Sequence, residues 1–298
     1  MMKEKFEFGR RSLPAVIWKP EKVEAVIQIA HGMTEHMGRY EEFAGEMNAH
    51  GIAVAGFDLP GHGCNPGDPE VASFGEGGWQ AVLEDMRLFH EHLMEVFPGV
   101  PQMMLGFSLG SFLLRDYLNI YPTDSLAGVI IMGTGHQPGW LLSIMMAIVS
   151  GQIKKVGFDH TSDLIKQLSF GTYNQKFKPN RTDADWLCSN VSTLDGYLAD
   201  PLVRKHISAG LFWELLGSMK RRSGKGEYDR WDKNLPVLLI SGAEDPVGDG
   251  GKGVRAIYQR MQKAGMQHVT LELIPGARHD VLHENSQAQE IILNWLEK

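Results

Sequence analysis

A serine between two glycines is the first candidate for chemistry in this chain. Residues 106–110 read Gly-Phe-Ser-Leu-Gly, with Ser108 at the centre. An apolar, strand-like run covers residues 102–105, and an amphipathic, helix-like segment begins at residue 111. A Gly-x-Ser-x-Gly turn between a strand and a helix exposes the serine hydroxyl as a nucleophile. Side chains at positions 106 and 110 would collide with the neighbouring strand and helix, so glycine is needed at both. The alternative is an ordinary serine in a glycine-flanked turn.

A serine hydroxyl is a weak nucleophile unless a base takes its proton and a carboxylate orients that base. Two later loops supply such groups. Asp245 follows the apolar run at residues 237–241, and His279 follows the run at residues 269–274. Both loops come after strands, as Ser108 does, and open α/β sheets bind ligands at that edge. The order Ser108, Asp245, His279 therefore predicts a catalytic triad.

Other residues near the predicted triad could take these roles. Glu244 and Asp249 are the rival carboxylates, and we favour Asp245 because a proline follows it and its side chain is shorter than that of glutamate. His283 lies four residues after His279, a spacing that two metal ligands can have, but no third ligand is apparent nearby. We interpret His283 as a solvated or capping residue.

The segment at residues 31–36, His-Gly-Met-Thr-Glu-His, follows the strand-like run at residues 25–30. A His-Gly turn there offers a backbone amide opposite the nucleophile. We assign the two oxyanion donors to the amides of Met33 and Leu109, each typically worth about 3–4 kcal/mol of barrier. His31 and His36 could be read as metal ligands, but no carboxylate or cysteine partner is clear, and we expect His31 to buttress the loop. The turn at residues 58–63 is expected to be structural.

Eight strand-like runs alternate with helix-like segments, which predicts an α/β fold with a mostly parallel eight-stranded sheet flanked by helices. Several runs are continuously apolar, as expected when helices cover both faces of a sheet. The predicted strands are 6–8, 15–18, 25–30, 52–57, 102–105, 128–132, 237–241 and 269–274, and the predicted helices between them are 40–50, 78–97, 111–120, 253–264 and 286–296.

About a hundred residues between the strands that end near Gly133 and begin at Pro236 lack convincing strands. This interval is too long for a plain crossover loop. It contains helical patterns at 163–168, 183–190, 192–199 and 208–219. We predict a core domain of residues 1–135 and 234–298, with a helical cap of residues 136–233 inserted into it. The apolar stretch 140–149 could line an acyl-chain channel, face a lipid surface, or be a buried helix on the core.

Composition excludes several other classes of protein. The chain has 298 residues, is 43% hydrophobic and carries a formal charge of -7, without a basic block, so nucleic-acid binding has little support. Cys64 and Cys188 do not suggest a disulfide framework. Residues 1–11 lack the apolar region of a secretory signal, and the stretch 140–149 is too short to span a bilayer. We expect a cytoplasmic protein without a metal, a cofactor or an obligate protein partner.

Six motifs together resemble the α/β-hydrolase branch of monoacylglycerol lipases and lysophospholipases, also described as serine aminopeptidase-like (S33). The resemblance covers nearly the whole chain. It implies an α/β-hydrolase fold, places nucleophile, acid and base at Ser108, Asp245 and His279, and places the oxyanion amides at Met33 and Leu109. The motifs are residues 31–36, 39–40, 58–63, 106–110, 245–248 and 278–279.

The chain departs from the family pattern beside the nucleophile. Phe107 and Leu109 stand where the family often has His and Met. Leu109 contributes its amide whatever its side chain, so the change bears on specificity more than on activity. Within the cap, residues 182–187 and 197–201 resemble bacterial members of the branch.

These observations predict a serine hydrolase that cleaves carboxylic esters through an acyl-enzyme. The expected substrate is a small-molecule or monoacyl lipid ester, of the monoacylglycerol or lysophospholipid type, with transient contact between the cap and a membrane surface. Acyl transfer or amide cleavage by the same triad is the alternative within enzymes. A non-catalytic ligand-binding protein on the same fold is the alternative outside them.

Overall fold

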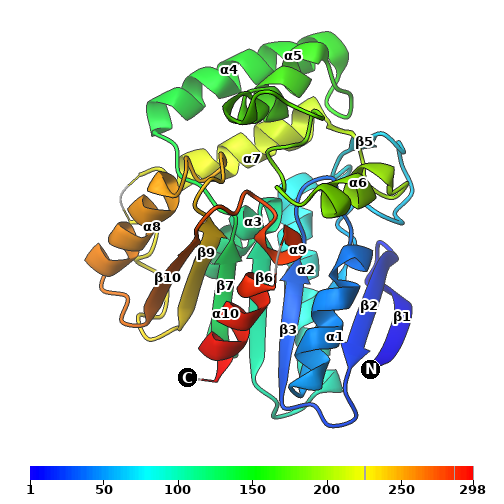
Figure 1. The fold of residues 1–298 in the computed structure, drawn as a ribbon, viewed down its shortest axis with the longest axis vertical. Helices are drawn as coiled ribbons and strands as arrows, with labels where there is room; N and C mark the ends of the chain where they lie inside the picture. Colours follow the sequence, from blue (N-terminus) through cyan, green and yellow to red (C-terminus); the bar gives the residue numbers. More distant parts are fainter. Residues whose placement is uncertain (225, 285, 298) are drawn as a thin grey trace.

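A computed structural model describes residues 1–224, 226–284 and 286–297 of the chain. Its main sheet has eight strands in the spatial order β1-β2-β4-β3-β6-β7-β9-β10 (Figure 1). Strand β2 pairs antiparallel with β1 and β4, whereas the other neighbours pair parallel. The predicted mostly parallel eight-stranded sheet is confirmed. The strands are β1 Met2–Phe8, β2 Leu13–Lys19, β3 Ala25–Ala30, β4 Ile52–Phe57, β6 Gln102–Phe107, β7 Leu126–Met132, β9 Val237–Gly242 and β10 Val269–Ile274.

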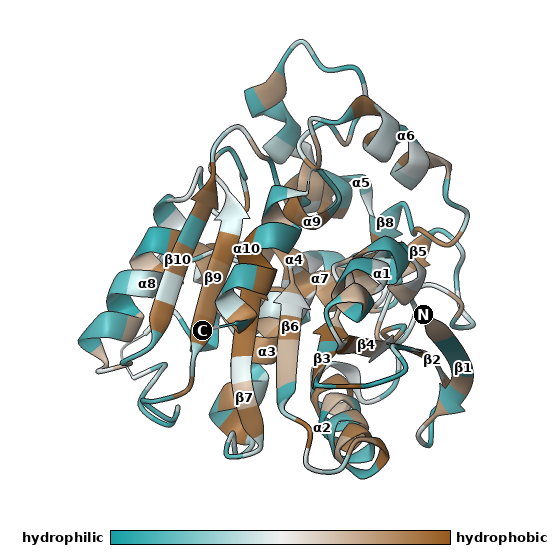
Figure 2. Cartoon of the chain, turned by 60° about the horizontal axis from the view of Figure 1, so that its bottom comes forward, coloured by the Kyte–Doolittle hydropathy of each residue, from teal (hydrophilic) through white to brown (hydrophobic). Residues whose placement is uncertain are grey.

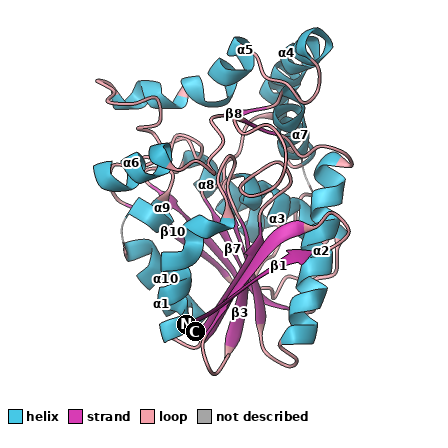
Figure 3. Cartoon of the chain, turned by 90° about the vertical axis from the view of Figure 1, so that its right-hand side faces the viewer, coloured by secondary structure: helices cyan, strands magenta, loops and turns pink. Residues whose placement is uncertain are grey.

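Helices lie on both faces of the twisted sheet (Figure 3), and the buried hydrophobic residues form two layers. Successive residues of a strand point to opposite faces, so Val129 and Ile131 of β7 join one layer, and Ile130 and Met132 join the other. Figure 2 shows β7 and β9 largely in the hydrophobic colour. The first layer includes residues of α2 Gly78–Val96, α3 Leu109–Ile120 and α8 Lys252–Lys263, and the second those of α1 Glu41–Ala49, α9 Val281–Glu284 and α10 Gln287–Leu296.

Between β7 and β9 the chain leaves the sheet and forms a group of helices that lies above it in Figure 1. Helix α7 packs against α4 and also against the core helices α2 and α3. A two-stranded sheet, β5 Val71–Ala72 with β8 His206–Ile207, joins this region to a core loop. The elements are α4 Gly139–Val156, α5 Asp163–Lys166, a π-helical turn Gln167–Gly171, a 3-10 turn Tyr173–Phe177, α6 Val191–Ala199 and α7 Ala209–Arg221.

Two expectations for this interval are wrong. A short strand, β8, is present where none was expected, and residues 183–190 form turns instead of a helix. The carboxylate of Asp185 accepts hydrogen bonds from the amides of Arg181 and Thr182 and from the Thr182 hydroxyl. These bonds resemble those at the start of a helix. The helix does not continue, and the main-chain oxygens of Asp185, Leu187 and Cys188 accept hydrogen bonds from the loop at residues 278–280 instead.

The apolar stretch at 140–149 lies in α4 and is divided between two environments. Leu142 and Val149 are buried, whereas Trp140, Ile144 and Ile148 are 68%, 51% and 41% exposed. The exposed residues are four apart, so they share one face of the helix. Neither a fully buried helix nor a fully exposed one describes α4. Among the described residues, no helix combines the length and the apolar character needed to cross a bilayer.

Candidate active site

Ser108 sits in a sharp turn between β6 and α3. Its φ of 50° is unusual for a residue with a side chain. A Cβ at Gly106 would lie 2.4 Å from the carbonyl oxygen of Gly110, and a Cβ at Gly110 would lie 1.8 Å from that of Ala30. Both glycines are therefore required by the close packing of the turn against α3 and β3, as the sequence predicted. The serine side chain is half-buried, with its hydroxyl at the carboxyl edge of the sheet.

The three residues predicted to form a triad are joined by hydrogen bonds. His279 Nε2 lies 2.8 Å from Ser108 Oγ, and His279 Nδ1 lies 3.0 Å from Asp245 Oδ1. Asp245 follows β9 and His279 follows β10, so loops at one edge of the sheet bring them together. The Asp245 carboxylate also accepts hydrogen bonds from the Ser241 hydroxyl and the Val247 amide, at 3.0 and 2.8 Å. These bonds fix the carboxylate toward the imidazole.

Both members of the histidine–aspartate pair are fully buried. Burial alone would lower the pKa of His279, but the charge and the hydrogen bond of Asp245 outweigh it and raise the pKa above the ordinary 6.5. The imidazole is thus a stronger base than a free histidine. This is the property that a group taking a proton from serine requires.

The rival carboxylates lie elsewhere. Asp249 is exposed, and its carboxylate lies 3.6 Å from Lys176 and 3.8 Å from Lys252. Among the described residues, the Glu244 side chain makes no hydrogen bond or ion pair with the His279 imidazole. Asp245 is the carboxylate that contacts His279.

The loop after β3 is held by a buried carboxylate. Glu35 Oε1 accepts hydrogen bonds from the Gly32 amide at 2.5 Å and from the Tyr40 hydroxyl at 2.7 Å. A Cβ at Gly32 would lie 2.8 Å from that carboxylate and 2.9 Å from the Phe107 ring, so glycine is needed there. The loop therefore passes directly beside the serine turn. Among the hydrogen bonds of the described residues, none uses the amide of Met33 or Leu109 as donor.

His31 and the turn at residues 58–63 support the same loop. His31 Nε2 accepts a hydrogen bond from the Leu59 amide at 2.9 Å, and its Nδ1 lies 2.7 Å from the Gly32 carbonyl oxygen. Burial lowers the pKa of His31, which keeps the imidazole neutral. Asp58 accepts from the Met37 amide at 2.7 Å. The structural roles expected for His31 and for this turn are confirmed.

An ionic bridge that sequence reasoning missed joins this loop to the histidine loop. Arg39 pairs with Glu35 through one nitrogen and with Asp280 through another, at 2.7 Å for the second contact. Asp280 in turn contacts His283 Nδ1 at 2.7 Å. The motif Arg39-Tyr40 was visible in the sequence, but the second partner of Arg39, Asp280, is 241 residues away.

The histidines that could be read as metal ligands in the sequence are hydrogen-bonded to protein groups instead. His36 Nε2 contacts Asp200 at 2.9 Å, and His283 contacts both Asp280 and the Arg39 carbonyl oxygen. The described ranges contain no cluster of three or more His, Cys, Asp or Glu residues suited to a metal ion. His283 is thus a half-buried member of the bridge, so of the two expectations for it, a solvated or a capping residue, the solvated one is wrong.

The helical region between β7 and β9 contacts the site directly. The Trp186 ring lies 5.1 Å from the His279 ring, centroid to centroid. The Tyr197 hydroxyl lies 2.8 Å from Thr34 Oγ1, and the Tyr197 ring faces the Arg39 guanidinium at 4.8 Å. Tyr173 is half-buried, and desolvation together with the charge of Asp245 raises its pKa to about 12. Residues of this helical region therefore contact both the histidine and the loop after β3.

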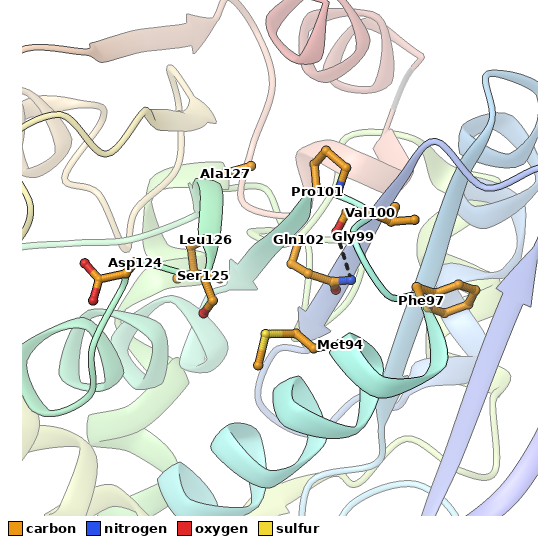
Figure 4. A pocket seen from close by; sticks show the side chains of 10 residues that line it. All are labelled: Met94, Phe97, Gly99, Val100, Pro101, Gln102, Asp124, Ser125, Leu126 and Ala127. Atoms are coloured by element: carbon orange, nitrogen blue, oxygen red, sulfur yellow. Dashed lines mark hydrogen bonds between the residues drawn. The ribbon is translucent and has the colours of Figure 1, made fainter.

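Two surface pockets lie far from this chemistry. One, of about 480 Å³, is lined by Met94, Phe97 and residues 99–102 and 124–127 (Figure 4). The other, of about 790 Å³, is lined by the first residues of several strands, among them Ala25, Ile52 and Val269. Both open at the amino ends of the strands, opposite the edge that carries Ser108. We assign the chemistry to the edge where hydrogen bonds join a hydroxyl, an imidazole and a carboxylate, because among the described residues no hydrogen bond joins such groups in the lining of either pocket.

Comparison with known proteins agrees with this architecture. The mouse (Mus musculus) monoglyceride lipase is 27% identical over 272 residues, which cover 89% of this chain and 78% of the relative. The monoacylglycerol lipase of Mycolicibacterium smegmatis is 25% identical, with coverage of 94% and 91%. A carboxyl esterase from Bacillus coagulans, solved with glycerol, superposes with a TM-score of 0.88 at 24% identity and covers 100% of this chain and 98% of its own.

That esterase supports the fold, which is the α/β-hydrolase fold with its eight-stranded sheet. The model of the serine aminopeptidase S33 family matches residues 21–286. The match spans the serine turn, both loops of the histidine–aspartate pair and the whole intervening helical region. The chain therefore belongs to the serine aminopeptidase S33 family of α/β-hydrolases.

Proposed function

We propose that this protein is a serine hydrolase that cleaves carboxylic esters, with Ser108, His279 and Asp245 as its catalytic residues. The observation that carries the proposal is the unbroken hydrogen-bond chain from Ser108 Oγ through the imidazole to the buried carboxylate. A hydroxyl in this arrangement can lose its proton as it attacks a carbonyl carbon. The similarity to monoglyceride lipases and to a carboxyl esterase supports esters as the substrate class.

The reaction proceeds in two halves. His279 accepts the proton of Ser108 as the hydroxyl attacks the ester carbonyl, and the amides of Met33 and Leu109 donate to the oxyanion. The imidazolium, which Asp245 stabilises, then gives its proton to the leaving alcohol. Water enters, His279 takes one of its protons, and the resulting attack releases the acid and restores Ser108. The raised pKa of His279 favours the proton transfer in the first half.

For the substrate we propose a monoacyl lipid ester, either a monoacylglycerol or a lysophospholipid. Residues 136–233 act as the cap that receives the acyl chain. The exposed face of α4, with Trp140, Ile144 and Ile148, would touch a lipid surface while the substrate leaves it. Its apolar side chains on one helix face, with Lys154 and Lys155 in the last turn, suit the boundary between headgroups and acyl chains.

The test compares the wild type with Ser108→Ala on p-nitrophenyl esters of increasing acyl length, on monoacylglycerols, on lysophospholipids and on peptide amides. We expect hydrolysis of the esters with a maximum at medium or long chains, and loss of hydrolysis in the variant with unchanged thermal unfolding. Retained activity in Ser108→Ala contradicts the triad, whereas a maximum at acetyl esters contradicts only the substrate class. A transfer product formed with an added alcohol would identify an acyltransferase instead.

A further inference from the structure

A segment of the cap, residues 185–189, is hydrogen-bonded along its length to the loop that carries His279. Main-chain oxygens of the cap are the acceptors, and groups of the histidine loop are the donors. One of these bonds joins two main chains, and the other two are donated by a charged side chain. Together they fix the relative position of the two segments more firmly than contacts between exposed side chains do. The Asp280 amide donates to Leu187 at 2.7 Å, and Arg278 Nη1 donates to Asp185 at 2.5 Å and to Cys188 at 3.3 Å.

The carboxylate of Glu284 joins the two segments from one position. Its Oε1 accepts from the Ser189 amide at 2.6 Å, and its Oε2 accepts from the Arg278 amide at 2.7 Å. Glu284 is 6% exposed. Hydrogen bonds to an ionised acceptor are short and roughly twice as strong as neutral ones, and burial strengthens them further. One side chain thus ties the cap to the residue before His279.

Between these ties lies Trp186, whose ring packs against the catalytic imidazole. The two ring planes are inclined by 35°. The imidazole also contacts Phe107 of the serine turn, at 5.0 Å between centroids. Trp186 is itself held, because its amide donates to Asn174 Oδ1 at 3.0 Å. The ring of His279 therefore contacts Phe107 of the core and Trp186 of the cap.

We propose that Glu284 is a positioning residue for the catalytic base and that residues 185–189 are a fixed support for His279 rather than part of a moving lid. The proposal rests on the proposed function, in which His279 is the base. The imidazole must keep one nitrogen at Ser108 and the other at Asp245, and a ring packed by Trp186 cannot swing away from either. Cap motion that admits a substrate then takes place outside residues 185–189.

The test uses Glu284→Ala and the conservative Glu284→Gln, both in a Cys64→Ser background. Cys64 is exposed and Cys188 is buried, so Cys188 is then the sole thiol and reports on release of residues 185–189. Burial raises the pKa of Cys188 to about 12, so the thiol reacts slowly while the segment stays in place. Kinetics on p-nitrophenyl butyrate and the rate of labelling by a disulfide reagent are measured together.

In Glu284→Ala we expect kcat to fall roughly 10- to 100-fold with KM nearly unchanged, because the base is misplaced while substrate contacts remain. Cys188 should be labelled at least tenfold faster. Glu284→Gln keeps an acceptor oxygen for one of the two amides and should recover part of kcat. An unchanged kcat, or unchanged labelling of Cys188, overturns the proposal.

The matched control is Glu214→Ala. Glu214 of α7 also accepts a main-chain hydrogen bond between cap and core, from the Trp79 amide at 3.0 Å, but it does not contact the histidine loop. This variant should keep the wild-type kcat and the slow labelling. An equal loss of kcat in both variants would show general loosening of the cap and also overturns the proposal. The thiol measurement does not depend on catalysis, so it separates this proposal from the triad, which Ser108→Ala tests.

Discussion

Arg39 Nη2 lies 2.7 Å from Asp280 Oδ2, across 241 residues of chain. The same guanidinium pairs with Glu35, whose carboxylate holds the Gly32 amide. One buried cation thus connects the loop proposed to bind the oxyanion with the residue next to His279. The Arg39 guanidinium therefore helps to hold both the loop of the proposed oxyanion donor and the loop of the proposed base.

Replacing this cation should be costly. In Arg39→Ala, two buried carboxylates, Glu35 and Asp280, lose their common partner. Breaking a buried pair from one side destabilises a protein by about 3–5 kcal/mol. We expect the free energy of unfolding in urea to fall by this amount and ester hydrolysis to fall with it. Arg87→Ala is the control, since its pairs with Glu84 and Glu91 are largely exposed and should contribute under about 1 kcal/mol. Equal effects would contradict the structural role of Arg39.

The ionised Asp280 carboxylate should contribute to the free energy of unfolding, and this contribution should be lost in acid. Burial alone would raise its pKa, but the charges of His283 and Arg39 outweigh burial and hold the pKa well below the ordinary 3.8. A lowered folded pKa gives stability that is fully present above the unfolded value and is lost as the pH falls below it. Asp280→Asn should therefore be less stable at pH 7, with a shallower loss between about pH 4 and 2. Urea unfolding at several pH values measures both, and an unchanged acid slope would count against this carboxylate.

The pH dependence of hydrolysis should follow the histidine–aspartate pair. Activity requires a neutral imidazole, so kcat/KM should rise with pH through the folded pKa of His279, which lies above 6.5. In Asp245→Asn the charge that raises this pKa is gone and burial lowers it, so the rise should move to lower pH. The rate itself should fall about 10⁴-fold. The rate of fluorophosphonate labelling at Ser108 gives the profile in both proteins. An unmoved profile would mean that another group titrates.

The serine turn should not tolerate a methyl group at position 110. Gly110→Ala places a Cβ within 1.8 Å of the Ala30 carbonyl oxygen, and backbone must shift to relieve it. We expect a loss of about 3 kcal/mol in unfolding free energy, or more, and loss of hydrolysis. Gly151→Ala in α4 is the matched control, because its Cβ meets nothing within 4 Å. That variant should gain up to about 1 kcal/mol. Thermal unfolding and an ester assay compare them.

The face of α4 should decide contact with lipid surfaces. Replacing Trp140, Ile144 and Ile148 by serine should weaken binding to phosphatidylcholine vesicles at least tenfold, since each apolar side chain contributes about 1.5–3 kcal/mol when fully buried. Hydrolysis of a short soluble ester should not change. A double serine variant at Val191 and Leu198 of α6, which are also exposed, should bind as the wild type does. Equal binding by the α4 variant would rule out this face as the contact.

Much of the fold could be predicted because its signals are local. A short apolar run bounded by turn residues, such as residues 237–241, favours a buried strand. The five residues around Ser108 specify a turn, because glycine leaves the space that the close packing requires. The order of Ser108, Asp245 and His279 also limited where each could lie, because the ends of parallel strands meet at one edge. The segment 183–190 could not be predicted in this way. Its main-chain oxygens accept hydrogen bonds from Arg278 and Asp280, and such distant partners leave no mark in the periodicity of the sequence.

The sequence by itself determined which residues can react and at which edge of the sheet they lie, since strand order and turn chemistry depend on neighbours in the chain. Only the tertiary structure decided how they are held. Arg39 meets Asp280, and Glu284 meets Ser189, after the chain has folded back over long loops. A buried charge needs a hydrogen-bonding or oppositely charged partner. When that partner is far away in the sequence, only the folded chain brings the two groups together.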